Sequence, residues 1–230
     1  MNKEDLLLEL HQFLSPQRIE RFESVLANRT RHFTVAVENI FQSHNASAVM
    51  RTCDCFGIQD LHVIANSNKY ALSKDVAMGA EKWVDMHSYY KKENNTQDCI
   101  DHLKAEGFQI VATSPHTNDV LLPEFDVTKK SAFFFGTEIT GLSDVVLGQA
   151  DAFVRIPMYG FTESYNISVS AALVLHDVVT RLKKSNINWA LSEEELLDKR
   201  IDWAVKSIKS GPQVLKQLLN QDSKVLSYGN

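Results

Sequence analysis

Three polar segments hold the side chains best suited to ligand binding, and each directly follows a short apolar run: TSPHTN (113–118), GTEITG (136–141) and MYGFTESYN (158–166). Their hydroxyl, amide and carboxylate groups can donate and accept hydrogen bonds. The two glycines of GTEITG lack a Cβ, so backbone N–H groups there can approach a ligand closely. We therefore expect a ligand site where these segments meet.

The pair Asn45 and Arg51, six residues apart in a segment with a helical pattern, is a further candidate. If Asn45 caps that helix and Arg51 lies within it, about one and a half turns separate them. Because an arginine side chain is long, both could reach the mouth of one site. The alternative is equally open: an arginine beside Ala48, Val49 and Met50 can lie along the surface with its guanidinium in water.

The sequence lacks the motifs of several common sites. No G-x-G-x-x-G follows the first expected strand and no G-x-x-x-x-G-K-[ST] occurs, which argues against dinucleotide and P-loop sites. No serine lies in a G-x-S-x-G elbow. Cys53, Cys55 and Cys99 have no second cysteine pair or histidine cluster to complete a metal set. We expect them to be reduced thiols, with no metal site.

Strands and helices that alternate along the chain must position these segments. Apolar or alternating runs predict strands at 33–37, 60–65, 83–89, 108–113, 131–136 and 153–158. Helical patterns at 46–56, 95–106, 142–149 and 166–182 fill the intervals, with Asn45 as the expected N-cap of the first and Gly57 after its end. This alternation predicts an α/β fold with a mostly parallel sheet flanked by helices. Such sheets bind ligands beyond the carboxyl ends of their strands, where the three polar segments fall.

Both ends of the chain predict helices without strands. Residues 4–13 and 16–27 form amphipathic patterns, with Ser15-Pro16 as a plausible N-cap and first-turn pair. SEEELLDKRIDWAVKSIKS (192–210) has acids in its first turn and lysines near its end, and a short helix follows Gly211-Pro212. We divide the chain into an N-terminal helical extension (1–32), an α/β domain (33–184) and a C-terminal helical extension (185–230).

Charge and hydropathy limit the possible partners. The net charge of −5 argues mildly against nucleic acid, because phosphate contacts need Lys and Arg. Basic side chains do gather in residues 15–34 and in RLKK (181–184), although each group can also be a solvated face. No apolar run reaches about 18 residues and the N-terminus has no cleavage signal, so we expect neither a membrane helix nor a signal peptide.

With these residues in view, the sequence resembles the SpoU (SPOUT) superfamily, and within it the TrmH-type tRNA guanosine-2′-O-methyltransferases. HNASAVMRTCDCFGIQDLHVI (44–64), FFFGTEITGLS (133–143) and IPMYGFTESYNISVSAALVL (156–175) are similar to the three family motifs in residue type, order and spacing. RIERFESVLANRTRHFTV (18–35) resembles the N-terminal extension of the enzymes that act on guanosine 18. The family often has Leu where this chain has Tyr165, which bears on substrate breadth.

The resemblance implies methyl transfer from S-adenosylmethionine to a ribose 2′-hydroxyl of tRNA, at guanosine 18 of the D-loop. It also implies a deep trefoil knot in the C-terminal part of the domain, a homodimer, a cytoplasmic location, and no membrane or DNA partner. The site residues that it implies fall into three groups. The catalytic residues are Arg51, Asn45, Glu138, Ser164 and Asn166; the cofactor-binding residues are Thr113, Gly136, Ile156 and Tyr165; the RNA-binding residues are Arg21 and Arg29.

Two alternatives to this function remain open. The chain could methylate ribosomal RNA or another tRNA position, or it could be a non-catalytic RNA-binding protein of the same fold. The role of Arg51 also has two versions, general base or activator of the hydroxyl. A guanidinium pKa above about 12 favours the second, in which Arg51 grips a phosphate and stabilises negative charge on the 2′-oxygen.

Overall fold

The computed structural model describes residues 1–66, 74–92, 94–114, 120–137 and 140–227. It divides into two compact units. Residues Thr30–Trp189 form an α/β unit, and residues Met1–Arg29 together with the chain from Ala190 onward form a helical unit.

The α/β unit is built on a seven-stranded sheet with the order β3-β2-β1-β6-β4-β7-β5. Every strand pairing in it is parallel, which confirms the predicted mostly parallel sheet. Six strands match the predicted ones, and β5 is an addition that only two residues form. The strands are β1 (Phe33–Glu38), β2 (Asp60–Ile64), β3 (Asp85–Tyr89), β4 (Gln109–Thr113), β5 (Val120–Leu121), β6 (Ser131–Phe135) and β7 (Ala152–Arg155).

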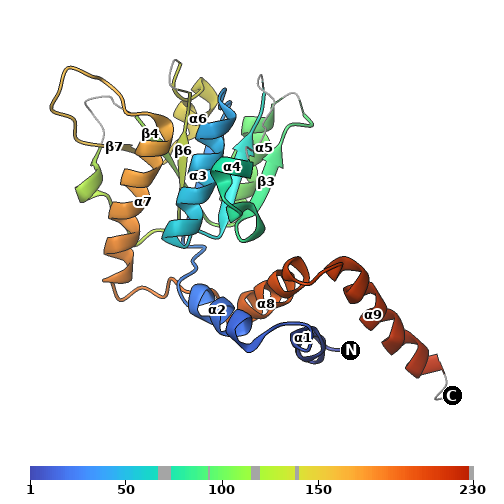
Figure 1. The fold of residues 1–230 in the computed structure, drawn as a ribbon. Coiled ribbons are helices and arrows are strands. Elements are labelled where there is room, and N and C mark those ends of the chain that lie inside the picture. The colour runs from blue at the N-terminus through green and yellow to red at the C-terminus, as the bar shows by residue number, and fades with distance from the viewer. Residues whose placement is uncertain (67–73, 93, 115–119, 138–139, 228–230) are drawn as a thin grey trace. The chain divides into compact units, whose positions relative to one another are not determined.

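Helices cover both faces of this sheet (Figure 1). One core joins the sheet to α3 (Ser43–Phe56) and α7 (Ile167–Lys183), and the other joins it to α5 (Asn95–Ala105) and α6 (Asp144–Gln149). Strand β1 shows how the sequence builds both cores, because Val35 and Val37 point into the first and Ala36 into the second. Short helical turns complete the unit: α4 (Lys74–Ala77), η1 (Ala80–Lys82) and η2 (Leu122–Glu124).

Helix α3 begins earlier than the sequence pattern predicts. Its N-cap is Gln42, so the expectation that Asn45 caps this helix was wrong. Asn45 lies in the first turn and is buried, and its side chain accepts a hydrogen bond from Asn166, the N-cap of α7. The predicted end is confirmed, because Gly57 adopts a left-handed conformation (φ 74°) directly after Phe56.

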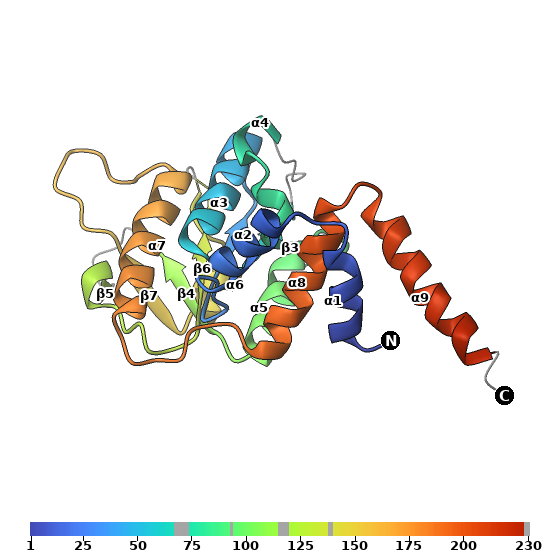
Figure 2. The same ribbon diagram turned by 60° about the horizontal axis from the view of Figure 1, so that its bottom comes forward.

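The helical unit contains α1 (Lys3–His11), α2 (Pro16–Leu26), α8 (Glu193–Ser207) and α9 (Gly211–Ser227). Figure 2 shows α1 beside α8, and Leu6, Leu10 and Ala204 are buried between them. The predicted Ser15 cap is confirmed, since its side chain accepts a hydrogen bond from the Arg18 N–H. Among the described residues, no helix is both long enough and apolar enough to cross a bilayer.

Candidate cofactor and substrate site

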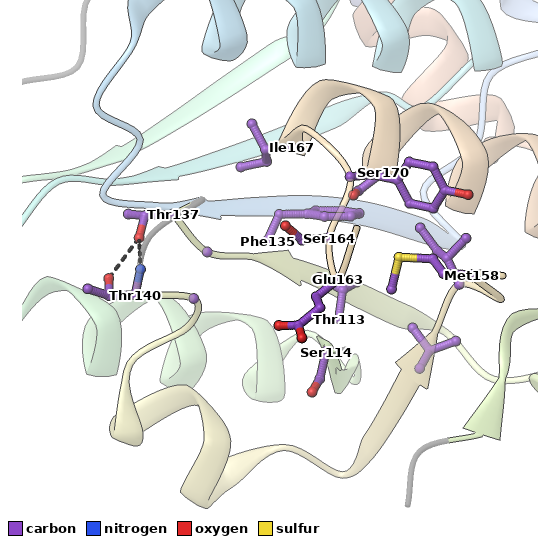
Figure 3. Close-up of a pocket in the computed structure, with 15 residues that line it drawn as sticks. Thr113, Ser114, Phe135, Thr137, Thr140, Met158, Glu163, Ser164, Ile167 and Ser170 are labelled. Carbon is purple, nitrogen blue, oxygen red and sulfur yellow. Dashed lines mark hydrogen bonds between the residues drawn. The ribbon is translucent and has the colours of Figure 1, made fainter. Parts of the chain in front are cut away.

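A cavity of about 390 Å³ opens beyond the carboxyl ends of β4, β6 and β7 (Figure 3). Residues from all three polar segments of the sequence line it, as expected for strands that end at one edge of a parallel sheet. Its walls mix apolar and polar side chains. The lining residues are Thr113, Ser114, Phe135, Gly136, Thr137, Thr140, Gly141, Val154, Ile156, Met158, Glu163, Ser164, Tyr165, Ile167 and Ser170.

All four residues predicted to hold a cofactor line this cavity: Thr113, Gly136, Ile156 and Tyr165. Thr113 ends β4, where its Oγ1 donates a 2.7 Å hydrogen bond to the carbonyl of Phe134 on the neighbouring strand. Ile156 follows β7 directly. Their meeting in one cavity comes from strand order, which no spacing along the chain reveals.

The two ends of the GTEITG segment pair with each other at the cavity rim. Thr137 and Gly141 exchange two backbone hydrogen bonds of 3.1 and 3.0 Å, and the Thr137 hydroxyl lies 2.7 Å from that of Thr140 (Figure 3). A Cβ on Gly136 would lie 2.2 Å from the backbone of Gly141, and Gly141 has a φ of +68°. Both glycines are thus required by the turn. Glu138 lies outside the described residues.

Asn45 and Asn166 form the one direct link between predicted catalytic side chains within the described part of the chain. The Asn166 Nδ2 donates to the Asn45 Oδ1 at 3.2 Å. The Asn166 Oδ1 in turn accepts hydrogen bonds from the Ser168 N–H and hydroxyl, which caps the start of α7. This pair fixes the first turn of α3 against the first turn of α7, beside the loop that carries Ser164.

Arg51 is placed differently from the other candidates. It is exposed on α3, and it does not line the cavity. Within the described ranges, no hydrogen bond or ion pair holds its guanidinium, so this group is available to a substrate. Ser164 does line the cavity, from the loop before α7.

Sequence reasoning missed several residues that the fold brings to the cavity, of which Glu163 is the most informative. Its carboxylate is the one charged group in the lining that the structure describes, and it would attract a positively charged ligand (Figure 3). Glu163 stands beside Ser164 in the segment already singled out, but the sequence does not say which loop side chains face inward. Ser114, after β4, was missed for the same reason, and Ser170 was missed because the sequence does not say which face of α7 meets the cavity.

The two residues predicted to bind RNA both belong to the helical unit, where they have different surroundings. Arg21 is exposed on α2. Arg29 is only 1% exposed, and its guanidinium lies 5.3 Å from the centroid of the Trp203 ring. The contacts made by Arg29 are those of a core residue of this unit, and its role towards RNA stays a prediction.

The basic RLKK stretch also has internal contacts. Arg181 forms an ion pair with Asp177 and donates to the carbonyls of Leu122 and Phe125. Lys183 lies over the ring of Trp189. Arg181 therefore fastens η2 to α7, which accounts for part of this charge without a nucleic acid.

Comparison with known proteins gives a consistent result. The SpoU rRNA Methylase family matches residues 32–176. The chain is 43% identical, over 92% of its length and 94% of the relative's, to the tRNA (guanosine(18)-2′-O)-methyltransferase of Borreliella burgdorferi. It is similar to the TrmH/SpoU tRNA modifying enzyme of A. aeolicus, with a TM-score of 0.73, 32% identity, and coverage of 84% of this chain and 98% of that one. It shares its fold with the SpoU methyltransferase AviRb from Streptomyces viridochromogenes, solved with AdoMet, at 22% identity, a TM-score of 0.59, and coverage of 70% and 65%.

Proposed function

The chain belongs to the SpoU rRNA Methylase family, and on that premise we propose that it transfers a methyl group from S-adenosylmethionine to the 2′-hydroxyl of guanosine 18 in tRNA. The observation that carries this proposal is the cavity, where the four expected cofactor positions and Ser164 lie together. The relative that is 43% identical bears the name of this activity, which supports the choice of nucleotide.

The cavity fits the proposed methyl donor in size and in chemistry. Its volume lies in the range of small-molecule sites, which is roughly 300–1,000 Å³. Phe135, Val154 and Ile156 offer apolar walls for an adenine ring, and the turn at Gly136 brings backbone groups close. Glu163 has the charge opposite to a sulfonium. S-adenosylmethionine supplies, when bound, a methyl group on a good leaving group, so the transfer needs no metal.

The protein's own residues then have to orient the ribose and stabilise charge. The Asn45–Asn166 bond sets the start of α3, the helix that presents Arg51. In the proposed role, Arg51 grips the neighbouring phosphate and stabilises negative charge on the 2′-oxygen, and a phosphate or water takes the proton. Ser164 would bond the phosphate or ribose from the cavity rim, and Glu138 would fix the GTEITG turn. Holding two reactants in line can lower such a barrier by about 7–11 kcal/mol in ideal cases.

The proposal includes a homodimer with sites near its interface. Exposed apolar side chains in the loop before α7 and on α7 itself support it. Tyr159 and Phe161 are fully exposed, and Val169 and Leu173 are partly exposed on the helix that follows. Monomeric proteins rarely leave such a group of large apolar side chains in water.

The proposal also includes the knot, the roles of the three chain segments and the location that the resemblance implies. We include a trefoil knot in the C-terminal part of the α/β domain. The strand order is compatible with it, because β4 lies between β6 and β7, which both follow β4 in the sequence. We assign RNA binding to the N-terminal extension (1–32), catalysis to residues 33–184, and an auxiliary helical role to residues 185–230. A cytoplasmic location follows from the proposed substrate.

Radiolabelled methyl transfer into bulk tRNA and into ribosomal RNA, followed by nucleoside mapping, tests the function. We expect label in tRNA alone, as 2′-O-methylguanosine at position 18, and none in a tRNA with 2′-deoxyguanosine there. Label in ribosomal RNA would favour the alternative that the protein methylates ribosomal RNA. Cofactor binding without transfer to any RNA would favour a non-catalytic RNA-binding protein.

A further inference from the structure

Glu38, the last residue of β1, is a buried carboxylate in an otherwise uncharged strand, FTVAVE. Its side chain is 2% exposed and accepts three hydrogen bonds. Oε2 accepts from the Ser143 N–H at 2.8 Å, and Oε1 accepts from the Ser143 hydroxyl at 2.7 Å and the Thr96 hydroxyl at 2.5 Å. Burying a carboxylate is costly unless such bonds offset the lost hydration.

Ser143 ends the short segment that leads from the turn at Gly136–Gly141 to α6. It caps α6 and comes two residues after Gly141, whose segment lines the cavity through Gly136, Thr137 and Thr140. Strand β6 fixes the start of this segment, since Phe135 is its last residue. Glu38 is thus bonded to the other end, through both the backbone and the side chain of Ser143.

The same network reaches the part of the site that holds Asn45. Asn66, after β2, donates from Nδ2 to the Thr96 hydroxyl at 2.8 Å, and its N–H donates to the Asn39 Oδ1 at 2.8 Å. Asn39 follows Glu38 and has a φ of 53°, which begins the bend that leads to α3. The turn at the cavity rim and the chain leading to α3 are therefore tied to one buried carboxylate.

We infer that Glu38 is a positioning residue of the methyltransferase: it holds the 140–143 segment where the cofactor cavity needs it. This inference rests on the proposed function, because it assigns the cavity to S-adenosylmethionine. Without the carboxylate, the Ser143 N–H and hydroxyl lose their acceptor, and the turn is free to move away from β1. The expected defect is in cofactor affinity, with the chemistry of the bound complex preserved.

The chain offers a matched control. Gln97 on α5 and Gln149 on α6 also join these elements, with amide hydrogen bonds of 3.2 and 2.6 Å. Neither residue lines the cavity. Gln149→Ala therefore removes a polar link between α5 and α6 without releasing Ser143.

The test compares Glu38→Gln, Gln149→Ala and the unaltered chain by calorimetric titration with S-adenosylmethionine, steady-state kinetics with tRNA, and thermal unfolding. Glu38→Gln keeps the size of the side chain but replaces one acceptor oxygen with an amide donor. We expect its Kd and KM for the cofactor to rise by about tenfold, the scale of one lost hydrogen bond to a charged group. Its kcat at saturating cofactor should stay within about twofold, and Gln149→Ala should keep the original Kd.

Three results would overturn the inference. The first is a Glu38→Gln protein with a lowered Tm and an unchanged Kd, which would show that Glu38 has only a structural role. The second is a Gln149→Ala protein whose Kd rises as much as that of Glu38→Gln. If Glu38→Gln does not fold, Ser143→Ala is the substitute, because it removes the hydroxyl donor alone and should raise the Kd severalfold. An unchanged Kd for Ser143→Ala is the third result that would overturn the inference. If the unaltered chain does not bind S-adenosylmethionine, both proposals fall, whereas binding with unaffected variants rejects only this one.

Discussion

At the scale of single residues, the separation of Arg51 from the cavity allows binding and chemistry to be tested apart. Arg51→Ala should lower the rate of methyl transfer to tRNA by about 10²–10³-fold, the scale of one lost group that stabilises charge in the transition state. Because Arg51 does not line the cavity, the Kd for S-adenosylmethionine should not change. Single-turnover transfer and calorimetry on the same preparation provide the check. A parallel loss of cofactor affinity would show that Arg51 shapes the cavity instead.

Glu163 predicts a preference for the charged cofactor over its neutral-sulfur product. In Glu163→Gln, affinity for S-adenosylmethionine should fall severalfold, while affinity for S-adenosylhomocysteine falls less, because only the first carries a sulfonium. The effect is modest since Glu163 is exposed and water screens it. Competition titrations of both ligands measure the ratio. Glu124→Gln, an exposed acid outside the cavity, is the control and should leave this ratio unaltered.

His62 predicts acid sensitivity of folding. Burial, followed by the charge of His87, lowers the pKa of His62 from 6.5 to about 3. The unfolded chain therefore binds a proton that the folded chain does not, so stability falls as the pH drops from 6.5 towards 3. This loss is up to about 1.4 kcal/mol per pH unit. His87 acts oppositely, because its hydrogen bond to Asp60 raises its pKa and favours folding at low pH.

His62→Gln separates these two contributions. Urea unfolding between pH 7 and about pH 4.5 should show a shallower loss of stability than in the unaltered chain, because the variant keeps a polar partner for Tyr89 without the titrating ring. His44→Gln replaces an exposed histidine and should leave the slope unchanged. Identical slopes for all three proteins would mean that His62 does not govern this pH dependence.

The sequence predicted single residues only where local chemistry determines them. Ser15 and Gly57 act where expected, because caps and left-handed ends depend on neighbours in the chain. Asn45 was misplaced because its amide had a distant alternative partner, Asn166, which competes with the helix backbone. Glu38 could not be found by pattern, since its donors come from positions far along the chain.

At the scale of elements, the turn of residues 136–141 should not tolerate a side chain at its first glycine. The Cβ of Gly136→Ala would lie 2.2 Å from the Gly141 backbone, so the turn must open. We expect cofactor binding to weaken by at least about tenfold, with the fold retained. Gly148→Ala, in α6, meets nothing within 4 Å and should bind normally while the helix gains up to about 1 kcal/mol. Calorimetry with thermal unfolding distinguishes the two, and normal binding by Gly136→Ala would show that the turn adapts.

Elements were predictable where a continuous apolar run or a helical period marks them. The apolar run SAFFF predicted β6, and the helical pattern at 166–182 predicted α7. β5 and α4 escaped because two and four residues carry no period. Their form is decided by what they pack against or pair with, as β5 pairs with the end of β7.

At the scale of the whole molecule, strand order was the decisive unknown. The alternation of strands and helices predicts a parallel sheet, but not that β6 lies between β1 and β4. That order brings the segments after β4, β6 and β7 to one cavity. Long-range packing likewise determines that Arg29 is buried, because Trp203, which its guanidinium contacts, lies far along the chain.

Substitutions of the two arginines implied to bind RNA should therefore affect different properties, namely RNA affinity for Arg21 and stability for Arg29. Arg21→Ala removes an exposed charge, so tRNA affinity should fall at low salt, and the slope of log affinity against log salt should decrease by about one. Its Tm should stay the same. Arg29→Met removes a buried guanidinium from the Trp203 ring and should lower the Tm, leaving the salt slope of the folded fraction unaltered. Filter binding from about 50 to 200 mM salt, with unfolding scans, separates the outcomes. A reduced slope for Arg29→Met at an unchanged Tm would mean that Arg29 leaves its buried position to meet a phosphate.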